Sequence, residues 1–250
     1  MEIWHFFLLT GVGVVAGWIN VMAGGGSMLS VPVMLFLGIP GPIANGTNRI
    51  AILAQNTVAV TAFFRAGHSD FRMSLSLALA AVPGAILGAM IGVRLTGPWF
   101  DRTLAAIMVV VMILMWAHPG RPVARPQSLT LTRSRLIWGH ICIFGAGLWG
   151  GFIQIGVGFI LMPILYRVLG FDLVRVNMHK VFIVLVYTVV ALIVFASQLQ
   201  LLWIVGLSLA AGNAIGGWLG ARTTTTKGEG TIRIVLYSVL VVFIVKLLAF

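Results

Sequence analysis

The chain has 250 residues, of which 60% are hydrophobic and only 8% are charged. Soluble domains carry about a quarter charged residues, so this composition excludes a soluble enzyme or binding module and predicts a polytopic protein surrounded by the lipid bilayer. The 16 Lys and Arg residues exceed the 5 Asp and Glu residues and give a net charge of +11. The positive-inside rule assigns this excess to loops on one side of the membrane, so no nucleic-acid partner is expected.

The apolar residues fall into ten segments, at about 3–22, 28–38, 46–65, 73–94, 101–117, 136–153, 157–169, 176–196, 201–221 and 231–249. The second and seventh are shorter than the roughly 20 residues of a full span, so they are expected to be half-helices or members of broken pairs. The first has no basic residue before it and is expected to stay as a span rather than leave as a signal peptide. A Pro- and Arg-rich linker at 118–135 separates a first transmembrane repeat, 1–117, from a second, 136–250.

The two halves carry the same landmarks in the same order. Gly25 and Pro32 recur 131 residues later as Gly156 and Pro163, and at this offset Asn48-Arg49 falls on His179-Lys180. A ladder of glycines four residues apart recurs at an offset of 128 and is interpreted as a helix contact face: Gly84, Gly88 and Gly92 in the first half, and Gly212, Gly216 and Gly220 in the second.

A repeat of five segments places its second copy in the opposite orientation. Alternating segments then put most loop Lys and Arg residues on the side of the linker, which the positive-inside rule makes cytoplasmic, with both termini outside. The predicted fold is an all-α polytopic membrane protein with two inverted five-segment repeats, whose broken or half helices meet near the midplane.

Three stretches carry a family resemblance: GVVAGWINVMAGGGSMLSVP, GTNRIAIL and GGFIQIGVGFILMP. In this order, and over nearly the whole chain, they resemble the sulfite exporter TauE/SafE family of bacterial membrane transporters. The resemblance implies transport of small sulfur-containing or organic anions across the cytoplasmic membrane, typically outward. Where that family usually has a Thr-Ser pair, this chain has Thr47-Asn48-Arg49 and Met178-His179-Lys180, so the resemblance leaves the substrate open.

The glycine clusters suggest how an anion could bind. Gly24–Gly26 precede one short helix and Gly156–Gly158 the other, and a helix N-terminus presents free amides and a partial positive charge. Glycine lets a ligand reach the backbone. The alternative is a tight interfacial turn whose glycines serve close helix packing.

Polar residues on one face of the third segment add a second signal. Asn48, Arg49, Gln55 and Asn56 share that face, and the matching face of the eighth segment holds His179, Lys180 and Tyr187. Each half is therefore expected to send one cation toward a shared centre. The predicted substrate-binding residues are Asn20, Gly24, Gly25, Gly26, Ser27, Asn48, Arg49, Gln55, Asn56, Gln154, Gly156, Gly158, His179, Lys180 and Tyr187. The alternatives are that both cations snorkel to headgroups and that the amides only join helices.

The sequence thus predicts a secondary transporter in the bacterial cytoplasmic membrane, not an enzyme. It would export a small anion such as sulfite, a sulfonate like sulfoacetate, or a small organic acid, by alternating access. No cofactor or metal is expected, the coupling ion is either a proton carried by His179 or none, and a homo-oligomer is compatible with the pattern. The main alternative is an anion channel. A remote one is an intramembrane serine protease that pairs Ser27 with His140 or His179.

Overall fold

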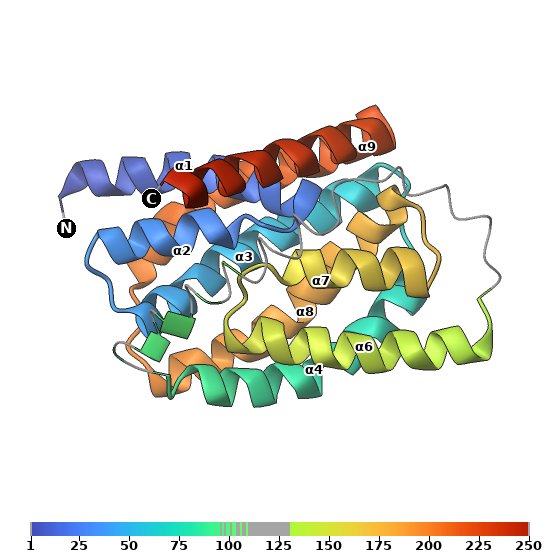
Figure 1. Ribbon diagram of the computed structural model, residues 1–250, viewed down its shortest axis with the longest axis horizontal. Coiled ribbons are helices and arrows are strands. Elements are labelled where there is room, and N and C mark those ends of the chain that lie inside the picture. The colour runs from blue at the N-terminus through green and yellow to red at the C-terminus, as the bar shows by residue number, and fades with distance from the viewer. Residues whose placement is uncertain are drawn as a thin grey trace.

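The computed structural model describes residues 2–95, 97, 99, 100, 102, 103, 106, 109 and 131–249, and for 227–249 the backbone alone. Nearly all of the predicted segment 101–117 and of the linker 118–135 lies outside these described residues. Within them the chain forms helices and no strand (Figure 1). In chain order these are α1 (Ile3–Ala23), α2 (Ser27–Phe36), α3 (Gly41–Arg65), α4 (Phe71–Gly92), α6 (Arg133–Phe152), α7 (Val157–Pro163), the π-helical turn η1 (Ile164–Val168), α8 (Leu173–Gln198) and α9 (Trp203–Ala249).

Four described stretches are long and apolar enough to cross a membrane: α1, α4, α8 and residues Trp203–Thr226 of α9. The chain is therefore a multi-pass membrane protein. Two shorter apolar helices, Ser27–Phe36 and Val157–Val168, coincide with the predicted half-helices. The helix α3 has 25 residues but carries buried Asn, Gln and Arg side chains along its length, which lower its hydropathy.

The predicted boundary between the last two segments is wrong, because α9 continues as a helix through residues 222–230. The polar residues between the two predicted segments, four threonines among them, are accommodated inside the helix. Thr223 donates its hydroxyl to the Leu219 carbonyl, and Thr224 donates to the Gly220 carbonyl one turn back. This local bonding satisfies each hydroxyl without breaking the backbone ladder.

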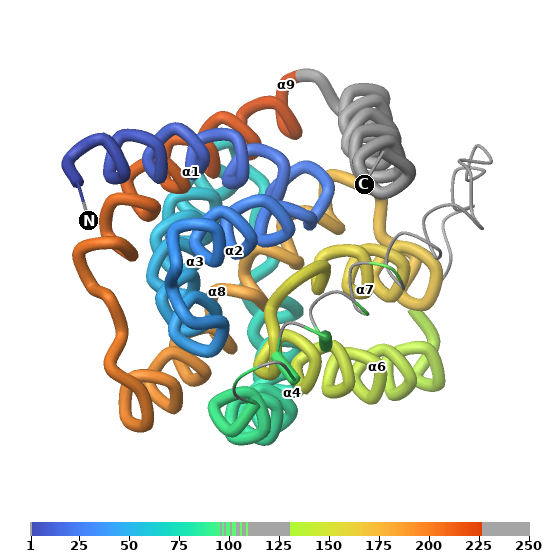
Figure 2. The backbone as a smooth tube through the Cα atoms, turned by 60° about the vertical axis from the view of Figure 1, so that its left-hand side comes forward, coloured from blue at the N-terminus to red at the C-terminus, as the bar shows by residue number. Residues whose placement is uncertain are grey.

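The helices form three layers. α1 lies along α9 on one side of the molecule and α4 lies along α6 on the other, with α2, α3, α7 and α8 between them (Figures 1 and 2). Both outer pairs therefore join a helix of the first half of the chain to one of the second half.

The glycine ladders make these outer pairs close, as predicted. A Cβ on Gly84, Gly88 or Gly92 of α4 would overlap the backbone of Phe144, Leu148 or Phe152 on α6. In α9, Gly212, Gly216 and Gly220 face Thr10, Val14 and Trp18 of α1 in the same way. Contacts advance in the same direction on both partners, so the helices of each outer pair run parallel. The interpretation of the ladders as helix contact faces is confirmed.

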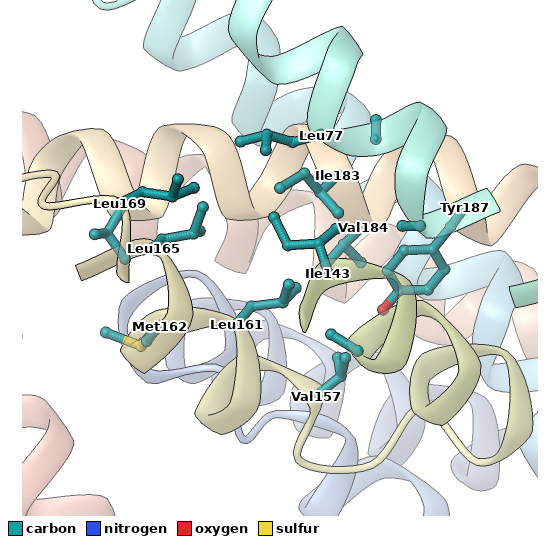
Figure 3. Close-up of a cluster of buried hydrophobic side chains, with 14 of the residues drawn as sticks. Leu77, Ile143, Val157, Leu161, Met162, Leu165, Leu169, Ile183, Val184 and Tyr187 are labelled. Carbon is teal, nitrogen blue, oxygen red and sulfur yellow. The ribbon is translucent and has the colours of Figure 1, made fainter. Parts of the chain in front are cut away.

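The two long central helices run antiparallel. Near the start of α3, Gly46 packs against Phe195 at the end of α8. At the opposite end Asp70, which follows α3, forms an ion pair with Arg175 at the start of α8. The largest apolar cluster lies where α4, α6, α7 and α8 meet, with Leu77, Ile143, Leu161 and Ile183 packed together (Figure 3).

Candidate functional site

The two glycine clusters that interrupt the helices, Gly24–Gly26 and Gly156–Gly158, contact each other at a crossing. Gly24 ends α1 in the left-handed conformation, with φ 86°, and Gly156 precedes α7 with φ 70°. A Cβ on Gly24 would overlap the Cα of Gly158, and a Cβ on Gly158 would overlap that of Gly24. The backbones of the two breaks therefore touch at a point that only glycine permits.

Helix α2 begins at Ser27 and α7 at Val157, so the N-termini of both short helices lie beside this contact. The hydrogen bonds of the first break run from the amides of Met28 and Leu29 back to the carbonyls of Gly25 and Gly26. Within the described part of the chain the amides of Gly25, Gly26 and Ser27 form no backbone hydrogen bond, as expected for the first turn of a helix. The ring of Phe159 lies directly over Gly25.

Arg49 is fully buried, with 0% of its surface exposed. Its Nη1 donates to the Gly150 carbonyl at 3.0 Å and to Gln154 Oε1 at 3.2 Å, and its Nη2 donates to the Gly151 carbonyl. The guanidinium carbon lies 4.4 Å from the centre of the Phe195 ring. Arg49, from the first half, thus binds the last carbonyls of α6, where the helix dipole favours a cation.

Gln154 supports this arrangement. It follows α6 with φ 64°, and among the described residues other than glycine it alone has a positive φ. Such a backbone is strained for a side chain with a Cβ, and here it accompanies a bond from Arg49 to the Gln154 amide oxygen. Tyr187 belongs to the same region, since the end of its ring packs against Gly150.

Lys180, from the second half, makes the corresponding contacts with the broken helix of the first half. It is 2% exposed, and its Nζ donates to the Val21 carbonyl and to Asn177 Oδ1, each at 2.7 Å. Val21 lies in the last turn of α1, so a cation from the second half binds a carbonyl at the C-terminal end of the first half's broken helix. Both cations are enclosed by protein, which is the opposite of snorkelling to headgroups.

The sequence predicts a shared centre toward which Arg49 and Lys180 both point, but in the structure the two side chains point to opposite ends of the helix pair. The head of Arg49 lies at Phe195, which follows Lys180 by 15 residues on α8, about 22 Å of helix rise. Lys180 points the other way, toward Asn177 and the start of α8. Helical side chains lean toward the N-terminus of their own helix, so cations on antiparallel helices point to opposite ends. The two cannot hold one small anion together.

The remaining predicted residues form two smaller networks. The Asn48 amide donates to Ser27 Oγ at 3.2 Å and accepts from Ser30 Oγ at 2.7 Å, which ties the start of α2 to α3. Asn20 donates to Gln55 Oε1 at 3.2 Å and so joins α1 to α3. Asn56 bonds the Ile52 carbonyl of its own helix. These contacts are the interhelical kind that the packing alternative describes, and they also leave Gln55 Nε2 without a partner.

His179 lies away from both cation heads. Its Nδ1 is 2.8 Å from Ser74 Oγ on α4, and its ring stacks on Phe171 with centroids 4.5 Å apart. The other histidine of the protease alternative, His140, pairs with Ser76. Neither is bonded to Ser27, whose hydroxyl contacts Asn48.

Sequence reasoning missed Asn177, Ser30 and Ser74. Asn177 is fully buried beside Lys180, and its Nδ2 has no hydrogen-bond partner among the described residues. Spacing could have found it, because Asn177 precedes Lys180 by three residues and so shares its helix face. Within the same described part of the chain, no three His, Cys, Asp or Glu residues gather to hold a metal ion.

Comparison with known proteins identifies the family. A family model of the sulfite exporter TauE/SafE matches residues 9–247. A probable membrane transporter protein of Sinorhizobium sp. is 30% identical over 241 residues, which cover 94% of this chain and 89% of the relative. One of Haemophilus influenzae is 27% identical over 89% of this chain and 86% of its own length. The probable membrane transporter protein YfcA of Escherichia coli is 24% identical over 95% and 87%.

No solved structure matches the chain. The family match extends over both halves, including the two glycine breaks and the helices that carry Arg49 and Lys180. The relatives are aligned over nearly their full lengths, so the similarity is not confined to one apolar segment. This multi-pass membrane protein therefore belongs to the sulfite exporter TauE/SafE family of membrane transporters.

Proposed function

We propose that the protein is a secondary transporter that exports a small anion: sulfite, a sulfonate such as sulfoacetate, or a small organic acid. The observation that carries this proposal is a charge imbalance in the interior. Arg49 and Lys180 are buried, while no Asp or Glu side chain is buried in the described part of the chain. The described ion pair, Asp70 with Arg175, lies at a helix end with both side chains partly exposed.

The helix ends offset only part of this charge. A helix C-terminus carries about half a negative elementary charge, so Arg49, and Lys180 whenever it is protonated, each keep roughly half a positive charge uncompensated. Burying such a charge is unfavourable unless a partner neutralises it. A small anion at the crossing of the breaks, within reach of the free amides of Gly25–Ser27, would supply the missing charge.

Alternating access follows from two inverted repeats, which we infer from the paired features of the halves. The broken helix of each half is bound by the cation of the other, and the two breaks touch at glycines. Rocking one half against the other about this crossing would expose the anion to each side in turn. We place the protein in the bacterial cytoplasmic membrane with both termini outside and the linker inside.

Counterflow in liposomes tests the function. Purified protein reconstituted with sulfite, sulfoacetate or small carboxylates inside should accelerate uptake of the same labelled anion from outside, and the rate should saturate. An anion channel would give flux that follows the membrane potential without this trans-stimulation. Cations and neutral solutes should not move, and their transport would overturn the proposal.

Cysteine labelling in intact cells tests the topology. In a Cys142→Ser background, Glu2→Cys should react with a membrane-impermeant maleimide from outside, while Arg125→Cys should react only after lysis. Labelling of both positions from one side would remove the inverted arrangement and leave the transport assay unaffected.

A further inference from the structure

The surroundings of Lys180 match an uncharged amine. Its Nζ contacts two acceptors, the Val21 carbonyl and Asn177 Oδ1. A neutral amine has two N–H groups and can satisfy both. An ammonium has three, and the third finds no acceptor among the described residues. Protonation of Lys180 in the empty protein would therefore bury both a charge and an unsatisfied donor.

The same place offers an unused donor to a ligand. Asn177 is fully buried, its Oδ1 is taken by Lys180, and its Nδ2 has no partner in the described residues. An anion oxygen placed beside Asn177 would accept from Nδ2 and from the third N–H of a protonated Lys180. One anion together with one proton would thus satisfy both Asn177 Nδ2 and the third N–H group of Lys180.

No charged group in the described part of the chain opposes this reading. Val21, whose carbonyl accepts from Lys180, belongs to an apolar cluster with Ala59 and Phe63 of α3 and Ala221 of α9. Met178 and Val181, which flank Lys180 in the chain, are members of the same cluster. Among the charged or titratable residues on these helices whose side chains the structure describes, Arg65 and Arg222 are exposed, Arg49 lies at the far end of α3, and His5 lies at the far end of α1. On α8 and its N-cap, His179 faces Ser74, Arg175 pairs with Asp70, and Asp172 accepts from the first amides of the helix.

We propose that Lys180 is the proton-binding residue of the transporter and that one anion and one proton bind at Lys180 and Asn177 together. The proposal rests on the proposed function and adds the coupling ion to it. The proton comes from water on the side where the anion enters, forms the third N–H bond of Lys180, and returns to water when the anion leaves on the other side. Arg49 does not take this part, because a guanidinium stays protonated.

Calorimetry on the full-length protein decides the matter. Binding of sulfoacetate and methanesulfonate is measured at pH 6.5–8.5 in two buffers of different ionisation enthalpy, since the charge of neither probe changes in that range. The wild type should take up about one proton per anion, and its affinity should fall roughly tenfold per pH unit because the two ligands are linked. Anion uptake into liposomes should carry protons with it.

Two variants separate a carried proton from a fixed charge. Lys180→Arg should bind the probes with no proton uptake and with an affinity independent of pH, while Arg94→Gln, which changes an exposed arginine, should behave like the wild type. Binding by the wild type without proton uptake would overturn the inference and leave the proposed function standing, and the wild-type measurement decides this even if Lys180→Arg fails to fold. Retained uptake in a folded Lys180→Arg would also overturn it. Failure of both probes to bind, together with failure of sulfite, sulfoacetate and small carboxylates in the counterflow assay, would overturn the proposed function together with the inference.

Discussion

The Arg49 end and the Lys180 end of this transporter hold matching positions in the two halves of the chain and differ in what surrounds them. Arg49 has three oxygen acceptors and an aromatic ring within reach, whereas Lys180 has two acceptors and apolar neighbours. In both cases a side chain from one half binds the other half's broken helix at its C-terminal end, Arg49 through two carbonyls and Lys180 through one. In the proposed mechanism, the same arrangement of cation and helix end holds a permanent charge at Arg49 and a removable charge at Lys180.

This difference follows from the chemistry of the two side chains. The planar guanidinium distributes its N–H groups over several acceptors and keeps its proton in any protein environment. The lysine amine is compact and can exist without a charge when it is enclosed by apolar groups. An anion that meets Arg49 therefore meets a fixed charge. At Lys180, the proposed mechanism requires it to arrive with a proton.

The largest effect is expected where the two ends are joined, at the glycine crossing. Gly24→Ala puts a Cβ on a left-handed residue and into the backbone of Gly158, while Gly158→Ala suffers the overlap alone. Left-handed strain costs about 1–2 kcal/mol and overpacking about 1–3 kcal/mol. Both variants should lose thermal stability in detergent, Gly24→Ala more than Gly158→Ala.

Gly145→Ala is the matched control for the crossing. Gly145 lies in α6 with no atom of the described residues within 4 Å of its would-be Cβ, so alanine should leave stability unchanged or raise it by up to about 1 kcal/mol. Equal melting temperatures for all three variants, measured by size-exclusion after heating, would show that the breaks do not touch.

The second prediction gives each cation a permanent partner. Gln154→Glu places a carboxylate beside Arg49, and Asn177→Asp places one beside Lys180, at positions already within hydrogen-bond distance. The carboxylate beside Lys180 would neutralise that cation and repel the anion, so Asn177→Asp should weaken binding by at least roughly 100-fold, about 2.7 kcal/mol. Gln154→Glu should weaken binding less, because Arg49 does not bind the same anion. If the cations only fix the fold, both variants should bind anions normally, and isothermal titration with sulfoacetate distinguishes the two results.

The third prediction removes the cations one at a time. Charge-assisted hydrogen bonds contribute about 1.5–3 kcal/mol, so Lys180→Gln should weaken anion affinity by roughly 10- to 100-fold, and Arg49→Gln should weaken it less, because Arg49 does not bind the same anion. Arg94→Gln, at an exposed position, should bind as the wild type does. Affinities that are near normal and equal in all three variants would exclude both cations from the site.

Part of the fold and of the candidate site can be predicted from the sequence. The half-helices, the glycine ladders and the pairing of Arg49 with Lys180 in the repeat can be derived from spacing, because helix period and duplication are written along the chain. The direction in which each cation points cannot, since it depends on α3 and α8 being antiparallel neighbours. For the same reason Gln154 is recognised as a polar residue after a helix, but its bond to Arg49 is a contact between residues 105 positions apart.

Asn177 and the α9 boundary illustrate two other limits. At the offset of 131, Asn45 falls on Val176, so the comparison of the two halves does not draw attention to Asn177, the buried amide that Lys180 contacts. The predicted boundary falls at 222–230 because these residues are polar, and the intrinsic helix propensity of the four threonines among them is low. Their bonds to carbonyls one turn back belong to a helix that packs against α1, and packing overrides propensity.

The smallest effect is expected at His179, the proton carrier that the sequence alone favoured. Ser74→Ala removes the bond from Ser74 Oγ to the imidazole and should lower stability by about 1 kcal/mol, the usual contribution of one hydrogen bond. Because this pair lies on the side of α8 that faces α4, away from Asn177 and Val21, proton uptake per anion and anion affinity should not change. Calorimetry in two buffers provides both values. Loss of proton uptake in a variant that still binds the anion would assign the coupling site to His179 instead of Lys180. Arg49 and Lys180 would then differ only in the number of acceptors around each cation.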